Sequence, residues 1–159
     1  MKINTGGNWP FFCAYNDSRY ILCHDEKKIV VLREPKESRE YRLENRSCKE
    51  LVEYRIDGGV ITSNDVLKCD FGVFTEDNVL YLVELKGADY IRALEQILST
   101  IRLLVVRPAI KVARLNARIV LSKVSVPAIM SSQEKKLLAL VKSKSGNLIK
   151  QSRILEEII

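Results

Sequence analysis

The hydrophobic pattern of the chain changes near residue 88, from a period of two to helical spacing. Alternating apolar and polar positions indicate strands that bury one face, whereas apolar residues three and four apart indicate an amphipathic helix. Before residue 45 the apolar runs are short and β-prone, and polar turns separate them. These runs predict an N-terminal antiparallel β meander with strands at 11–15, 19–23, 28–32 and 40–43.

The stretch after the meander carries two competing signals. Ser47 and Glu50 have the spacing of a helix capping box, whereas apolar and charged residues alternate over 52–57 as they do in a strand. We interpret the stretch as a short turn followed by that strand. Residues 60–62 are expected to continue the strand after a bend.

The clearest strand signal lies in residues 68–87, which predict a β-hairpin around the polar turn 75–78. Asp70 lies in the first strand, and Glu84 and Lys86 lie near the end of the second. Because side chains alternate along a strand, Glu84 and Lys86 share one face. In a strand this apolar that face would normally be core, so two opposite charges there require an explanation.

The rear part of the chain predicts a helix over 88–106, a buried strand over 113–124 and a second helix over 131–142. A strand, a helix and a strand in this order imply a parallel, right-handed crossover. A short strand at 148–149 and a terminal helical turn at 154–159 complete the expected elements.

These elements predict the α/β (α+β) fold class, with a mixed sheet and flanking helices. A length of 159 residues fits a single domain, in which the meander of residues 1–45 precedes a core of residues 46–159. The composition, 47% apolar and 29% charged, is typical of a globular protein. No apolar run reaches the ~18 residues that cross a bilayer, and the first residues lack a signal-peptide hydrophobic segment. We therefore expect a cytoplasmic protein with no membrane partner.

The net charge of +6 is unevenly distributed. Residues 1–86 carry 13 basic and 15 acidic side chains, a net charge of −2, whereas residues 87–159 carry 13 basic and 5 acidic side chains, a net charge of +8. A basic half beside an acidic pocket suits a polyanion such as nucleic acid, because basic groups release counterions from phosphates and carboxylates hold a cation. A soluble protein with a lysine-rich surface would have the same net charge, so charge alone does not identify the ligand.

Asp70, Glu84 and Lys86 together fit metal-dependent cleavage of a phosphodiester. This reaction needs a cation that neutralises the phosphate, an activated water and correct positioning. Mg²⁺ prefers oxygen ligands and keeps several waters, so one or two carboxylates on neighbouring strands suffice to bind it. Burial and a nearby cation lower the pKa of a lysine, which would let Lys86 orient or deprotonate the attacking water. A structural ion-pair network is the alternative interpretation.

The order Asp70, Glu84-Leu85-Lys86 and a following helix resembles the PD-(D/E)xK nuclease superfamily, which includes restriction endonucleases and Holliday-junction resolvases. The resemblance covers residues 47–125 and implies a restriction-endonuclease-like core. The motif itself is only three charges, so its specificity comes from the strand–strand–helix context.

The resemblance implies roles for particular residues. Asp70 and Glu84 would be metal ligands, the carbonyl of Leu85 would be a third, and Lys86 would orient the water. Gln96 matches a glutamine that some members use near the nucleophile or the phosphate. The implied cofactor is Mg²⁺ or Mn²⁺.

The chain departs from the family pattern in two respects. Cys69 replaces the proline that gives the motif its name, a common and harmless change. No clear acidic residue lies on an upstream helix, and Glu50, Glu53 and Asp57 are all candidates for that role. We favour Asp57 as a further metal ligand, because the end of a strand beside the hairpin can face the metal. The run over residues 83–100 also resembles small uncharacterised bacterial proteins placed in this superfamily.

The resulting hypothesis is a metal-dependent endonuclease that hydrolyses phosphodiester bonds, in DNA rather than RNA. Many double-strand cutters of this type dimerise, so the resemblance allows a homodimer, although no surface in the sequence identifies an interface. Two alternatives remain open at the level of sequence. One is a catalytically inactive nucleic-acid-binding module of the same fold. The other is a protein-interaction or inhibitor component in which the charges serve structure only.

Overall fold

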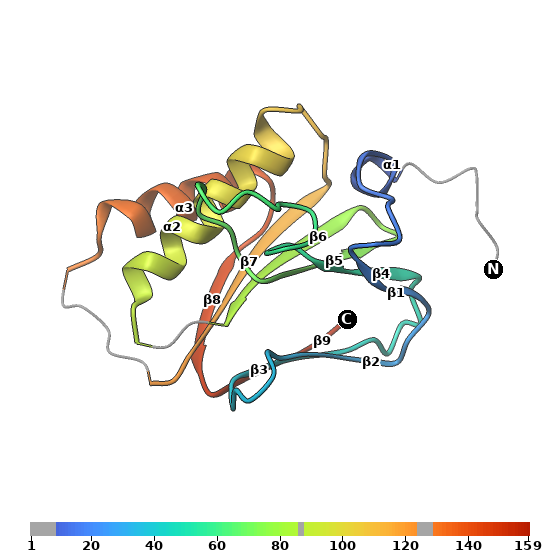
Figure 1. Cartoon of the computed structure of the whole chain (residues 1–159), viewed down its shortest axis with the longest axis horizontal. Coiled ribbons are helices and arrows are strands. Elements are labelled where there is room, and N and C mark those ends of the chain that lie inside the picture. The colour runs from blue at the N-terminus through green and yellow to red at the C-terminus, as the bar shows by residue number, and fades with distance from the viewer. Residues whose placement is uncertain (1–8, 86–87, 124–128) are drawn as a thin grey trace.

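A mixed six-stranded sheet forms the centre of the molecule in the computed structural model, which describes residues 9–85, 88–123 and 129–159 (Figure 1). Its strand order is β1-β4-β5-β6-β7-β8. The strands are β1 (Ile21–Asp25), β4 (Leu51–Arg55), β5 (Phe71–Thr75), β6 (Val79–Leu85), β7 (Arg114–Leu121) and β8 (Leu148–Ser152). The pairs β1–β4, β4–β5 and β5–β6 are antiparallel, whereas β6, β7 and β8 run parallel to one another.

A layer of different structure covers each face of the large sheet (Figure 1). One face packs against α2 (Tyr90–Ile101), its π-helical continuation η1 (Arg102–Val106) and α3 (Ser132–Ser143). The opposite face packs against a three-stranded sheet of order β2-β3-β9. Because both faces are covered, every residue of β6 is buried, as a near-continuous apolar run in a central strand requires. The strands of this small sheet are β2 (Ile29–Leu32), β3 (Glu40–Glu44) and β9 (Ile154–Ile158).

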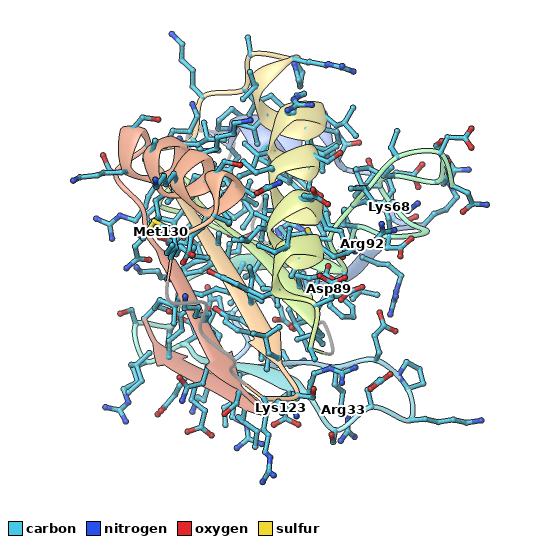
Figure 2. The ribbon with its side chains drawn as sticks, turned by 90° about the vertical axis from the view of Figure 1, so that its left-hand side faces the viewer. Arg33, Lys68, Asp89, Arg92, Lys123 and Met130 are labelled. Atoms are coloured by element: carbon cyan, nitrogen blue, oxygen red, sulfur yellow. The ribbon has the colours of Figure 1, made fainter. Side chains whose placement is uncertain are left out.

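The expected hairpin and crossover are confirmed. β5 and β6 pair from Thr75–Val79 to Phe71–Val83, and Asn78 closes their turn in the left-handed conformation that asparagine tolerates (φ 63°). β6 continues through α2 into the parallel strand β7. Asp89 caps α2 by accepting a hydrogen bond of 2.9 Å from the backbone N–H of Arg92, and both residues lie on the helix face visible in Figure 2.

The second helix is also confirmed, and Ser131 is its N-cap, as expected. Ser131 accepts a hydrogen bond of 3.1 Å from the backbone N–H of Glu134, which starts α3 at the position that the sequence predicts. The last strand of the large sheet, β8, is longer than the expected pair of residues at 148–149.

The predicted meander over residues 1–45 is wrong in its pairing. β1 pairs with β4 in the large sheet, whereas β2 and β3 form a hairpin in the small sheet. Residues 11–15 were expected to be a strand, but α1 (Pro10–Ala14) occupies this position because Pro10 favours the first turn of a helix. α1 buries Phe11, whose ring lies 5.3 Å from that of Tyr54 and 5.6 Å from that of Phe74.

Two further expectations are corrected. Residues 60–62 do not extend β4, and the part of the chain described there contains only an isolated bridge between Asp57 and Ile61. The expected terminal helical turn at 154–159 is the strand β9, which pairs in parallel with β3. Arg153 adopts a left-handed conformation (φ 64°) and turns the chain from β8 in one sheet into β9 in the other. Along the described chain, no helix is long and apolar enough to cross a membrane.

We expect Leu155→Ala to lower the free energy of unfolding by about 2–5 kcal/mol, because Leu155 is only 3% exposed and fills the space between the two sheets. Ile158→Ala on the same strand is the matched control. Ile158 is 55% exposed, so its loss should change stability by about 0.5 kcal/mol or less. Denaturant unfolding of the two variants measures the difference, and equal losses would contradict the packing of β9 into the core.

Candidate functional site

Asp70 and Glu84 meet at the end of the β5–β6 hairpin, on the face of the large sheet that packs against α2. The register pairs Phe71 with Val83, so the next pair along the hairpin is Asp70 and Glu84. Directly opposite residues of an antiparallel pair point to the same face. Alternation along β6 places Glu84 on the helix-covered side together with Leu82. The expectation that both carboxylates share one side of the sheet therefore holds in the structure.

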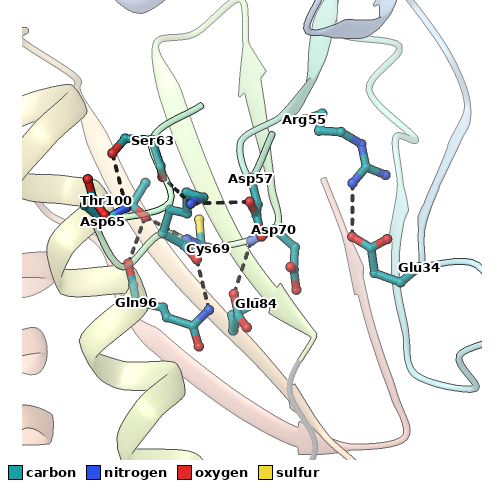
Figure 3. Close-up of polar contacts among 11 residues, drawn as sticks. Glu34, Arg55, Asp57, Ser63, Asp65, Cys69, Asp70, Glu84, Gln96 and Thr100 are labelled. Carbon is teal, nitrogen blue, oxygen red and sulfur yellow. Dashed lines mark hydrogen bonds and ion pairs between the residues drawn. The ribbon is translucent and has the colours of Figure 1, made fainter. Parts of the chain in front are cut away.

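Two hydrogen bonds cross between the strands and hold the carboxylates in place (Figure 3). The backbone N–H of Asp70 donates to Oε2 of Glu84 at 3.1 Å. The backbone N–H of Leu85 donates to Oδ2 of Asp70 at 2.8 Å. Each carboxylate is thus bound by the main chain of the strand that carries the other, which fixes the two groups beside each other.

The carboxylates lie in a largely buried environment. Glu84 is 1% exposed, and Asp70 is half-buried. Burial, reinforced by the nearby charges of Glu84 and Asp70, raises the pKa of the Cys69 thiol well above its usual value. Burial and the neighbouring negative charges therefore favour the neutral thiol beside the two acids.

α2 clamps the segment that leads into Asp70. The side-chain amide of Gln96 donates from Nε2 to the carbonyl of Lys68 at 2.9 Å. Thr100 accepts a hydrogen bond of 2.8 Å from the backbone N–H of Cys69 and donates its own hydroxyl to the carbonyl of Gln96. Gln96 and Thr100 are four residues apart and share a helix face, so together they fix the two residues before Asp70.

This clamp shows a role that sequence reasoning missed. Thr100 is completely buried, and its contact with Cys69 positions the backbone of the candidate site. The signal in the sequence was a polar pair at helical spacing, Gln96 and Thr100, on a helix face that is otherwise apolar. Gln96 was expected near a nucleophile or phosphate, and in the structure its amide nitrogen binds the backbone of Lys68.

The oxygen of the Gln96 side chain is available for a further contact. Oε1 is buried and has no hydrogen-bond partner among the residues that the structure describes. Gln96 lies on the buried side of α2, the helix that packs on the face of the sheet to which Glu84 belongs. An unpartnered buried acceptor costs about 1–3 kcal/mol unless water or a ligand satisfies it. The position of Oε1 therefore fits a polar guest next to the carboxylates.

The carboxylate of Asp57, the favoured further ligand, lies near a lysine. Its Oδ1 lies 3.6 Å from Nζ of Lys68, although its backbone N–H donates to the carbonyl of Asp70 at 3.4 Å. Lys68 also donates to the carbonyl of Ser63 (Figure 3). The structure therefore pairs Asp57 with a lysine beside the two carboxylates.

The other upstream candidates lie away from Asp70. Glu50 precedes β4 at the far end of the hairpin, because Leu51 pairs with Thr75, and its Oε1 lies 2.8 Å from Nε2 of His24. Glu53 pairs with Val73 on the face that packs against the small sheet, and its carboxylate forms an ion pair with Lys27.

The remaining expectations concern Leu85 and Lys86. Leu85 ends β6, next to Glu84 and in contact with Asp70 through its N–H. Lys86 lies outside the described residues. Across the residues for which the structure gives a placement, no group of three or more His, Cys, Asp or Glu side chains could hold a metal ion. The site is therefore a pair of carboxylates with an adjacent amide oxygen.

We expect Thr100→Val to lower the free energy of unfolding by about 1–3 kcal/mol, because it leaves the buried N–H of Cys69 without its acceptor while keeping the shape of the side chain. Thr100→Ser keeps the acceptor and is the matched control. Thermal or denaturant unfolding should rank the variants wild type, Ser, Val in decreasing stability. A valine variant as stable as the serine variant would show that the clamp contributes nothing.

Comparison of the chain with protein-family models, with curated proteins and with solved structures finds no match. The contacts around Asp70, Glu84 and Gln96 are therefore the basis on which a function can be assigned.

Proposed function

We propose that this chain is a Mg²⁺- or Mn²⁺-dependent nuclease of the PD-(D/E)xK type, acting on DNA rather than RNA. The observation that carries the proposal is the pair of hydrogen bonds between Asp70 and the Glu84-Leu85 segment. They hold two carboxylates side by side at the end of a central strand. Two like charges this close raise each other's energy, and a bound cation offsets that cost.

The order of elements around the pair supports the same proposal. The antiparallel strands β4, β5 and β6 are followed by α2 and by β7, which is parallel to β6. A hairpin, a helix and a parallel strand in this order are what the restriction-endonuclease-like core requires. Asp70 precedes β5 and Glu84 lies in β6, as the resemblance implies for the first and second acidic positions.

The residues at the site fit a hard divalent cation. Carboxylate and carbonyl oxygens are the ligands that Mg²⁺ prefers, and two carboxylates with bound waters are enough to hold it. Asp70 and Glu84 would supply the carboxylates, and the carbonyl of Leu85 a further oxygen. A carboxylate accepts several contacts at once, so the backbone N–H on each one does not prevent ion binding.

When bound, the cation neutralises the phosphate and lowers the pKa of a coordinated water. Asp70 and Glu84 would hold the cation on the side of the sheet that packs against α2, the helix that carries Gln96. Oε1 of Gln96 can accept a hydrogen bond from the attacking water and align it with the phosphorus. Lys86 remains proposed as the group that orients or deprotonates this water.

The experiment is a cleavage assay with plasmid DNA, single-stranded DNA and RNA in Mg²⁺, Mn²⁺ or EDTA. We expect Asp70→Asn and Glu84→Gln each to reduce the cleavage rate at least ~100-fold. Replacing a residue that only hydrogen-bonds to a metal ligand reduces activity about 10–100-fold, and replacing the ligand itself should reduce it at least as much. Glu95→Gln is the matched control, because Glu95 lies on the same helix as Gln96 and contacts Gln133.

The outcomes separate the proposal from its alternatives. Metal-dependent cleavage that both site variants abolish and the control retains would support the nuclease. Binding that depends on salt but gives no cleavage under any metal would instead indicate a binding module. The absence of both binding and cleavage would favour a protein-interaction role and contradict the proposal.

A further inference from the structure

A polar cleft opens between the loop that follows β4 and the surface of α2. Its volume is about 440 Å³. The charged and amide side chains that line it are Asp57, Asn64, Asp65, Lys68, Arg92 and Gln96. Figure 2 shows Lys68 and Arg92 close together on the same side of the molecule. The cleft contains two cations and two carboxylates, so its specificity depends on where each charge lies.

Lys68 is the buried cation of the cleft. It is 7% exposed, and among the described residues its ammonium group binds the carbonyl of Ser63 and lies 3.6 Å from Oδ1 of Asp57. The second distance is too long for a hydrogen bond. An ammonium carries three N–H donors, and a buried charge that is only loosely paired is costly. A second anion on the cleft side of Lys68 would reduce that cost.

Arg92 supplies a second cation on the opposite wall. It is exposed on α2, four residues before Gln96, so both side chains lie on one face of the helix. A guanidinium binds phosphate oxygens in a bidentate manner, and an exposed arginine can do so without losing a buried partner. Lys68 and Arg92 therefore present donors to the same space from two sides.

The residues that line the cleft also connect it to the carboxylate pair. Lys68 lies two residues before Asp70, and its carbonyl is bound by Gln96. The backbone N–H of Asp57 donates to the carbonyl of Asp70 at 3.4 Å. A strand whose scissile phosphate sits at Asp70 and Glu84 would place a neighbouring phosphate in the cleft. The two carboxylates that line the cleft belong to the exposed residues Asp57 and Asp65. Their repulsion of a phosphate therefore acts at the rim of the cleft.

We propose that Lys68 and Arg92 form a subsite for the internal backbone phosphate next to the scissile one. This inference rests on the proposed nuclease function. In the empty subsite Asp57 is the ion-pair partner of Lys68, and this ion pair weakens when Lys68 binds the phosphate. This role of Asp57 differs from that of a metal ligand, because removal of its charge should strengthen the binding of the phosphate.

The test measures binding of a short fluorescein-labelled single-stranded oligodeoxynucleotide, with and without a terminal phosphate, in Ca²⁺ over about 50–200 mM NaCl. We expect Arg92→Gln to weaken binding and to reduce the slope of log K against log salt by about 0.7 for the lost phosphate contact with a single strand. Arg102→Gln is the matched control, because Arg102 is exposed on η1 and does not line the cleft. Asp57→Asn should bind the oligonucleotide several-fold more tightly and leave Mn²⁺ affinity unchanged.

Several results would overturn the subsite. A salt slope for Arg92→Gln equal to that of the wild type would do so, as would weaker binding by Asp57→Asn. An Arg92 effect confined to oligonucleotides with a terminal phosphate would contradict the assignment to an internal one. These results are independent of the nuclease test, because a chain that binds through Arg92 but never cleaves keeps the subsite and loses the catalytic function. If the chain cleaves DNA but Arg92→Gln has no effect on binding, the nuclease proposal is kept and the subsite is rejected.

Discussion

The hydrogen bonds between the ends of β5 and β6 are the constraint on which the rest of the site depends. The main chain of each strand binds the carboxylate of the other, so Asp70 and Glu84 cannot separate without breaking the hairpin. Beyond this point β6 is buried on both faces, and its residues 79–83 are all apolar or aromatic. The pair therefore lies where the hairpin ends and water or a ligand can reach Asp70.

α2 has two functions at once. Its apolar residues fill the core between helices and sheet, and its polar pair Gln96 and Thr100 binds the backbone of Lys68 and Cys69. The same segment carries Asp70 toward Glu84 and Lys68 toward the cleft. The packing of one helix thus sets the backbone positions of the segment from Lys68 to Asp70, and Thr100 contributes to this through its contact with Cys69.

Local periodicity was enough to predict the β5–β6 hairpin, α2, β7, α3 and the facing pair Asp70 and Glu84. These elements are long or strongly patterned, and their neighbours in the sequence are also their neighbours in space. The pairing of β1 with β4 and of β9 with β3 could not be predicted, because strand partners distant in sequence leave no mark on a local pattern. The run Ile-Leu-Glu-Glu-Ile-Ile at the end of the chain is compatible with a helix or a strand until β3 is present beside it. The clamp by Thr100 was missed for the same reason, since its partner lies 31 residues away.

The parallel pairing of β3 with β9 has a consequence for synthesis of the chain. Arg42 and Glu156 are 114 residues apart in sequence, yet they face each other in the small sheet. β3 leaves the ribosome long before its partner exists, and its edge stays open during that interval. Non-local pairings of this kind are slow to form and expose strand edges to aggregation. The small sheet can therefore be completed only after residues 154–158 have left the ribosome, and until then the edge of β3 that they cover is exposed.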